Sequence, residues 1–389
     1  MNENSLKKSP LLSFLFAIII IEIVIGGSGR LIDIGPLSLK MILFFLGMVV
    51  LVLNITKLKK NVIVQLQLFL TVCILLSISI GFINGAELSL LFEDIKPLIF
   101  FYLISYFYIS IQNRNDILKV VKYIKYGALA MSIIHLFVVI LLYLQIMDFS
   151  RFYEQQSEGS EIMFRNEVLF FYKGFLYLCI GFFFLLLSNK KIDKLLSILP
   201  LISICLTLTR GFIFSTLLVL FFYMLFINKQ IKVKIIALLS GILVTSYALP
   251  ILMEARSDNS SESDIMRTIT FDQVVYEINP FSFFFGHGFG NGVPIRRVHM
   301  EASFLEIFHK QGIFGLLFYL AIMVIVIGYY RNIKDENFKQ LSLPFLLSVI
   351  FVYLQSFTNP YVNNPIGISI ICITLVVLYR INLLQKKRI

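Results

Sequence analysis

The longest polar interval of the chain runs from Glu254 to Gly315 and reads EARSDNSSESDIMRTITFDQVVYEINPFSFFFGHGFGNGVPIRRVHMEASFLEIFHKQGIFG. It interrupts a sequence that is otherwise a succession of long apolar runs, so chemistry that needs polar side chains is expected here. The interval holds three of the four histidines and four of the twelve arginines, namely His287, His299, His309, Arg256, Arg267, Arg296 and Arg297.

The chain around this interval has the composition of a membrane protein. Of its 389 residues, 58% are hydrophobic and 15% are charged, which is too few polar groups to cover a soluble globule. We predict an all-α integral membrane protein, a single polytopic domain over residues 1–389 with about 12 transmembrane helices. The apolar segments are Leu11 to Gly27, Leu37 to Ile55, Val62 to Ile83, Pro97 to Ile111, Ala128 to Met147, Val168 to Leu187, Leu195 to Leu208, Gly211 to Ile227, Ile235 to Met253, Ser303 to Tyr330, Leu341 to Phe357 and Ile366 to Leu384.

The distribution of lysine predicts how these segments are oriented. Lysines concentrate in every second interval, beginning with the N-terminus, and an excess of positive charge is typical of cytoplasmic loops. Both termini are therefore expected in the cytoplasm, and the large loop of residues 254–302 is expected on the extracytoplasmic side. The net charge of +11 has the same origin and gives no reason to expect binding of nucleic acid.

Arginine has the opposite distribution, with eight of the twelve in the outer intervals. A planar guanidinium can pair with two phosphate oxygens at once, so these arginines indicate an anionic ligand such as a lipid diphosphate. The alternative, that they are ordinary residues in contact with lipid headgroups, stays open for any one of them. Arg210, in the sequence TLTRG between two apolar segments, is a candidate because a cation at the membrane face is costly unless it is paired.

Two features are expected within the large outer loop. Residues Ser261 to Ile278 have apolar positions close to helical spacing, which predicts an amphipathic helix at the membrane interface that carries Arg267. The sequence FFFGHGFGNG then follows, and its glycines Gly286, Gly288 and Gly290 permit a tight turn with the backbone close to a substrate. Another outer interval, Gly85 to Lys96, leads into the fourth apolar segment; it lacks a DxD-type carboxylate pair and could simply be a solvated loop.

The ordered set of TLTRG, Arg267 ahead of FGHGFGNG, and HMEASFLEIFHKQGIFGLLFYL resembles the superfamily of bacterial O-antigen ligases and polymerases. The resemblance implies a GT-C-like membrane glycosyltransferase that acts on undecaprenyl-diphosphate-linked glycans, without nucleotide, cofactor or metal. It places the enzyme in the bacterial cytoplasmic membrane, with its active site on the outer face. The spacing to the GxxG turn puts the family's histidine position at Glu301, and His299 lies two residues earlier, so the catalytic base is open between the two.

Cleavage of the bond between a sugar and a diphosphate needs two kinds of group. Fixed arginines stabilise the charge that grows on the leaving diphosphate, and we expect Arg210, Arg267, Arg296 and Arg297 in this role. A carboxylate or an imidazole removes the proton of the attacking hydroxyl, as Glu301 or His299 could. For Glu306 and Lys310, four residues apart, a plain helical ion pair is the preferred interpretation.

Other functions share parts of this pattern. A ligase would transfer the glycan to a different lipid acceptor, whereas a lipid-linked oligosaccharide flippase or secondary transporter would carry it across the membrane. Transporters commonly have two six-span repeats and a long central cytoplasmic loop, but the long loop here is external, which favours an enzyme. Expected partners are the lipid-linked oligosaccharide, membrane lipids, a chain-length regulator and a flippase.

Overall fold

The computed structural model describes residues 10–27, 33–34, 37–157, 161–228, 230–232, 234–235 and 260–386. Within them the chain is almost entirely helical, with two short antiparallel hairpins formed by β1 with β2 and β3 with β4. The first half contains α1 (Pro10–Ile25), β1 (Asp33–Ile34), β2 (Leu37–Ser38), α2 (Leu39–Leu53), α3 (Val62–Ile83), α4 (Leu88–Ile99), α5 (Leu103–Ser110), α6 (Arg114–Tyr143), α7 (Phe149–Ser157), β3 (Ile162–Phe164), β4 (Phe170–Tyr172) and α8 (Leu176–Leu186). The second half contains α9 (Lys191–Leu196), α10 (Ile198–Leu206), α11 (Arg210–Phe222), α14 (Ser260–Glu277), α15 (Pro280–Phe285), α16 (Ser303–Arg331), α17 (Glu336–Gln355) and α18 (Pro365–Lys386).

This architecture confirms an all-α membrane protein. Six helices are long and apolar enough to cross a membrane, and three shorter apolar helices accompany them, all counted among the described residues. The ninth predicted segment, Ile235 to Met253, lies outside the described residues apart from its first position. The total of twelve spans and the GT-C-like arrangement therefore stay predictions.

One predicted boundary is wrong. The fourth apolar segment was predicted to begin at Pro97, but the helix α4 begins at Leu88, so the interval from Gly85 to Lys96 is not simply a solvated loop, and its Asp94 is buried. Pro97 lies inside the last turn of α4 and has no N–H to donate to the helix, and a short 3₁₀ turn, Phe100–Tyr102, follows before α5.

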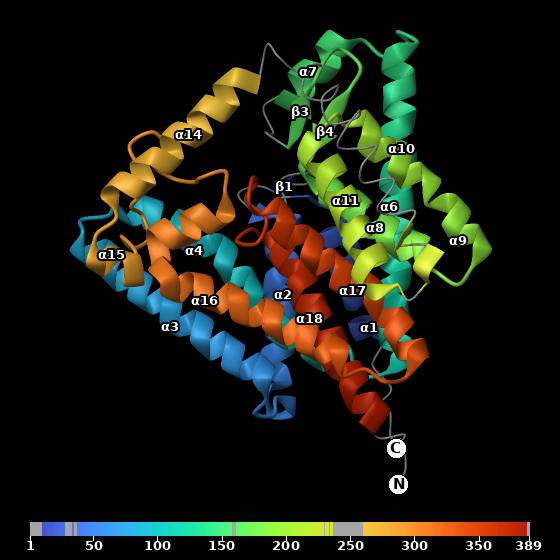
Figure 1. Cartoon of the computed structure of the whole chain (residues 1–389), viewed down its shortest axis with the longest axis horizontal. Helices are drawn as coiled ribbons and strands as arrows, with labels where there is room; N and C mark the ends of the chain where they lie inside the picture. Colours follow the sequence, from blue (N-terminus) through green and yellow to red (C-terminus); the bar gives the residue numbers. More distant parts are fainter. Residues whose placement is uncertain are drawn as a thin grey trace.

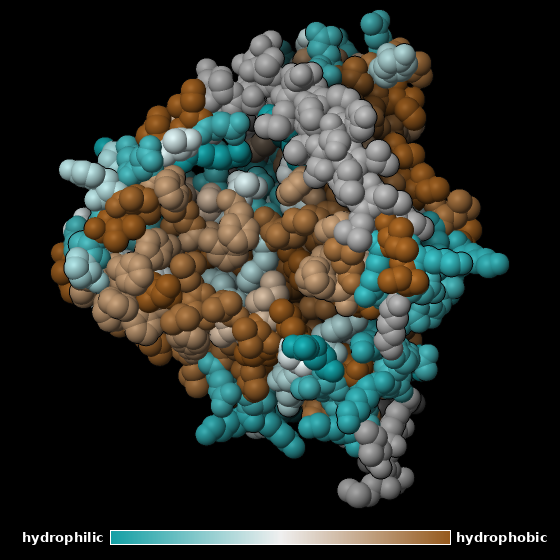
Figure 2. Space-filling model, in the orientation of Figure 1, coloured by the Kyte–Doolittle hydropathy of each residue, from teal (hydrophilic) through white to brown (hydrophobic). Residues whose placement is uncertain are grey.

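The helices divide into enclosed and peripheral ones. In the most apolar window of α18, 83% of the residues are buried, against 33% for α16, so α18 lies at the centre and α16 presents apolar side chains outward. Figure 1 shows α3 and α16 side by side on one flank, α6, α8, α10 and α11 on the other, and α17 and α18 between them. An apolar band crosses this face, with hydrophilic residues gathered at the lower edge and around α14 (Figure 2). Such a band is what a protein solvated by lipid requires.

A break in α16 allows the glycine-rich loop after α15 to dock on it. At Gly312 the backbone leaves the helical region, with φ 61° and ψ −159°. The carbonyls just before this break therefore cannot all accept from the N–H four residues further along, as they would in a regular helix. The N–H groups of His287 and Gly288 replace them, donating to the carbonyls of His309 at 2.8 Å and Lys310 at 3.0 Å. The loop is thereby hydrogen-bonded to the N-terminal third of a long helix.

The other side of the loop packs on α3. The N–H of Phe289 donates to the carbonyl of Ser77 at 2.9 Å, and a Cβ at Gly288 would lie 2.1 Å from the backbone nitrogen of Gly81. Gly288 also has a positive φ of 84°, which side chains rarely adopt. The glycines are therefore needed here so that three backbone segments can pass close together.

We predict that Gly288→Ala destabilises the protein by about 2 kcal/mol or more, because it adds a backbone clash to an unfavourable φ. The measurement is the midpoint of thermal unfolding in detergent. Gly85→Ala is the matched control, since Gly85 has a positive φ of 78° with nothing within 4 Å of its Cβ position. It should cost only about 1 kcal/mol, and equal effects of the two variants would contradict the packing argument.

Candidate functional site

Two of the predicted arginines meet at the predicted carboxylate. Arg267, on α14, donates through Nε to Oε2 of Glu301 at 2.7 Å, and Arg296 donates through Nη2 to Oε1 at 2.7 Å. Arg267 also pairs with Asp264, one turn earlier on α14, at 3.1 Å. All of these side chains are partly exposed, with Arg267 at 41% and Glu301 at 30%. Each carboxylate oxygen of Glu301 thus accepts from a different guanidinium.

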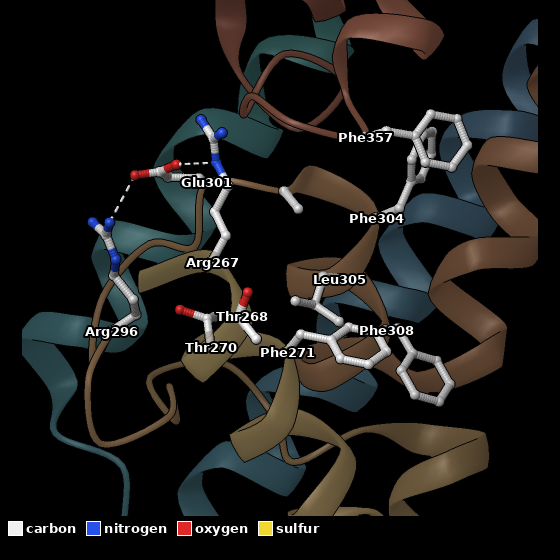
Figure 3. A pocket seen from close by; sticks show the side chains of 11 residues that line it. Arg267, Thr268, Thr270, Phe271, Arg296, Glu301, Phe304, Leu305, Phe308 and Phe357 are labelled. Atoms are coloured by element: carbon white, nitrogen blue, oxygen red, sulfur yellow. Dashed lines mark hydrogen bonds and ion pairs between the residues drawn. The ribbon is translucent and has the colours of Figure 1, made fainter. Parts of the chain in front are cut away.

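These groups form one end of a cavity of about 560 Å³. Figure 3 shows the arginine and glutamate side chains together at one end, with aromatic side chains extending along the wall away from them. The cavity therefore offers cations next to an apolar surface, the two kinds of contact that a lipid diphosphate would make. Its lining consists of Arg267, Thr268, Thr270, Phe271, Arg296, Glu301, Ala302, Phe304, Leu305, Phe308 and Phe357.

A second, buried group of charges lies beside this cavity. The Lys310 ammonium contacts Oδ1 of Asp94 at 2.6 Å and Oε1 of Glu306 at 2.8 Å, and it also donates to the carbonyl of Val298. The second oxygen of Asp94 accepts from the N–H of Gly290 at 2.8 Å. The side chains of Lys310, Asp94 and Glu306 are 5% exposed or less, so the cluster joins α4, α16 and the glycine-rich loop in the interior.

His299 extends from this cluster toward solvent. Its Nδ1 lies 3.4 Å from Oε1 of Glu306 and its side chain is 50% exposed, while Asn363 donates to the other Glu306 oxygen at 2.8 Å. The hydrogen bond to Glu306 raises the pKa of His299 above its usual value of 6.5. A histidine oriented at one ring nitrogen by a carboxylate, with the ring half exposed, has the geometry of a general base.

The remaining predicted arginines lie apart from Glu301. Arg210 is half-buried at the start of α11, and Arg297 is exposed in the loop before α16; among the described residues, neither pairs with a carboxylate. Next to Arg210, the carbonyl of Gly211 accepts from the side chain of Gln355, at the end of α17. The structure therefore brings together Arg267, Arg296 and Glu301, whereas the roles expected for Arg210 and Arg297 stay predictions.

The three predicted loop glycines all contact protein backbone or side chains. Gly286 lies against Lys310 and Gln311, Gly288 against α3, and Gly290 against Ala86 and Leu91. Their backbone carries the loop past α16 and delivers the N–H of Gly290 to Asp94. Direct contact with substrate stays a prediction for them.

Sequence reasoning missed the contribution of Asp94 and Asn363 to the site. It identified Glu306 and Lys310 as a helical pair, which the structure confirms, but the pair is buried and completed by a carboxylate 216 positions earlier. A signal was present, since Asp94 and Lys310 are ionisable groups beside apolar segments, and such groups are costly in a membrane unless they meet a partner.

Comparison with known proteins finds a relative that matches most of the chain. The chain is 27% identical over 377 residues to the O-antigen polymerase of Shigella flexneri, and the aligned part covers 94% of each chain. No family model matches the chain.

We predict that Lys310→Met strongly destabilises the protein, by about 3–5 kcal/mol, because two buried carboxylates lose their shared cation. Asp94→Asn in the same chain should recover part of the loss, since it removes one of the two charges. Lys96→Met, at an exposed lysine also on α4, is the control and should change the unfolding midpoint little. A midpoint for Lys310→Met equal to that of the control would contradict the role of Lys310.

Proposed function

We infer from this full-length similarity that the chain belongs to the superfamily of O-antigen ligases and polymerases, and we propose that it is a bacterial surface-polysaccharide polymerase. In this reaction the growing glycan is transferred from undecaprenyl diphosphate to a hydroxyl of a new lipid-linked repeat unit at the outer face of the cytoplasmic membrane. The observation that carries the proposal is the cavity in which Arg267 and Arg296 adjoin an aromatic wall.

The paired arginines suit the donor diphosphate. Glu301 presents two oxygens to two guanidiniums, as the oxygens of a diphosphate would, and thus holds Arg267 and Arg296 at a separation that fits such an anion. Negative charge grows on the diphosphate as the sugar bond breaks, and guanidiniums already in position stabilise it without further reorganisation. The apolar wall, including Phe271 and Phe308, would contact the first isoprenoid units.

For the catalytic base, the geometry favours His299 over Glu301. Both oxygens of Glu301 already accept hydrogen bonds from Arg267 and Arg296, so both are engaged with the arginines and not with an acceptor hydroxyl. In His299 an Nδ1–H donated to Glu306 leaves the lone pair of Nε2 for the acceptor hydroxyl. We therefore assign proton removal to His299, orientation of its ring to Glu306, and positioning of the arginines to Glu301.

The decisive experiment supplies purified protein in detergent with an undecaprenyl-diphosphate-linked repeat unit and no other acceptor. Chain growth, detected as a ladder on a gel, is expected for a polymerase. A transporter needs a membrane with two sides and a ligase needs a second kind of acceptor, so neither would produce a ladder. Absence of growth with folded protein would contradict the proposal.

Arg267→Ala and Arg296→Ala should each lower kcat/KM for chain growth by about 100-fold, the usual effect of removing one group that stabilises transition-state charge. Arg151→Ala is the matched control, because Arg151 is an exposed arginine on α7 outside the cavity, and its activity should stay within a few-fold of the unsubstituted protein. Equal activity of all three variants would argue against diphosphate binding in this cavity.

The pH dependence tests His299 as the base. Neutral imidazole is the active form, so the rate should rise with pH as His299 loses its proton at a pKa above 6.5. Glu306→Gln weakens the interaction that raises this pKa, so the rise should move to lower pH. His299→Asn should remove the rise together with most of the activity, whereas an unchanged profile in His299→Asn would assign the base to another group.

A further inference from the structure

A second cavity, of about 360 Å³, lies on the other side of the glycine-rich loop. It brings together the C-terminal residue of α14, Glu277, the loop residue His287 and the α16 residue His309. One ligand atom from each of the three lies within 4.8 Å of the other two. We propose that these residues bind a divalent transition-metal ion of the zinc class.

The chemistry of the donors supports this class of ion. Two imidazoles and a carboxylate are a common ligand set for zinc. Imidazole nitrogen binds zinc, copper and nickel in preference to magnesium and calcium, which favour oxygen ligands. At bond lengths of about 2.0–2.1 Å, ligand atoms around a tetrahedral ion are about 3.3 Å apart, so only small side-chain movements are needed. Nε2 of His309 and Oε2 of Glu277 already lie 3.7 Å apart.

The state of His309 points to a ligand independently of this clustering. Its side chain is 1% exposed, and among the described residues no hydrogen bond of standard geometry reaches either ring nitrogen, although the backbone of Asn291 lies close by. A buried polar group without a partner costs free energy, and most such groups in proteins are satisfied by protein, water or an ion. The ring stacks on that of His287, with centroids 4.6 Å apart, so both imidazoles face the same cavity.

Comparison with the other carboxylate-histidine cluster strengthens the argument. Asp94, His299 and Glu306 also have ligand atoms close together, but the ammonium of Lys310 lies among them and already supplies the positive charge. The lining of the second cavity includes no lysine or arginine, so no cationic side chain of that lining pairs with the carboxylate of Glu277. A cation fits the second cluster and would compete with Lys310 in the first.

The ion would join α14 to α16 and to the loop between them. Arg267 lies ten residues before Glu277 on α14, which corresponds to about 15 Å along a helix, so the ion is too distant to act on the transferred diphosphate. Its effect would be to fix the end of the helix that carries Arg267. The expectation of metal-free glycosyl transfer is therefore compatible with a metal ion that stabilises the fold.

The test is a titration of full-length protein in detergent, purified with a tag that contains no histidine and treated with a chelator. Isothermal titration with zinc chloride should give one ion per chain, and cobalt chloride should give the visible absorption bands of a low-symmetry site. Zinc should also raise the midpoint of thermal unfolding. None of these readouts depends on polymerase activity, so they can fail or succeed separately from the proposed function.

His287→Ala and Glu277→Gln should weaken zinc binding more than about 10-fold and abolish the zinc-dependent rise in the unfolding midpoint. His287 is half-buried in a loop, so its variant should fold even where a variant of buried His309 does not. His299→Asn is the matched control, because it removes a histidine from the other cluster, and it should bind zinc as the unsubstituted protein does. Absence of stoichiometric binding, or equal loss in His299→Asn, would overturn the proposal.

Discussion

The buried ion pairs of Lys310 with Asp94 and Glu306 are the interactions on which the arrangement of the two cavities and the glycine-rich loop depends. Removing one lysine and two carboxylates from water is costly, and the cost is offset only when their geometry satisfies all three. Here Lys310 meets Asp94, Glu306 and a backbone carbonyl at once, and Asp94 uses its second oxygen for Gly290. Any other arrangement of α4, α16 and the loop would leave one of these groups unpaired in the interior. The free-energy cost of such an unpaired group fixes the three segments in one relative position.

The break in α16 allows the glycine-rich loop to bind this helix between the two cavities. Because the helix is interrupted at Gly312, the carbonyls of His309 and Lys310 bind the glycine-rich loop while their side chains point into different surroundings. The Lys310 side chain enters the carboxylate cluster, and that of His309 enters the second cavity. The loop is thus hydrogen-bonded to α16, the helix that directly follows the segment carrying His299 and Glu301.

Much of the fold could be predicted from the sequence because a membrane imposes long apolar helices, and α3, α16 and α18 follow their predicted segments closely. The helix from Ser261 to Ile278 was also predicted, and α14 confirms it as a helix. The failure at α4 has a physical reason: its polar residues Glu93, Asp94 and Lys96 indicate solvent, whereas Asp94 is buried by partners far away in the sequence. Local patterns carry no information about such partners.

The site was predictable to a similar degree. Arginine enrichment in the outer intervals identified Arg267 and Arg296, but which carboxylate they pair with depends on the fold of the loop, since Arg267 and Glu301 are 34 positions apart. The same enrichment also indicated Arg210 and Arg297, which the structure places away from Glu301. Charge composition indicates a class of ligand, and tertiary packing decides which of the charged side chains lie together.

The two ion clusters differ in a way that suits their proposed tasks. The Lys310 cluster is almost completely enclosed, so breaking it would leave an uncompensated charge in the interior at a cost of about 3–5 kcal/mol. The pairs of Glu301 with Arg267 and Arg296 are 30–41% exposed, and pairs of this kind contribute only about 0–1 kcal/mol each. In the proposed reaction an arriving diphosphate would take the place of Glu301 beside both arginines at little cost, while the enclosed Lys310 cluster keeps α4, α16 and the loop in place. A binding site needs that difference, because a ligand competes successfully only with interactions that are weaker than its own.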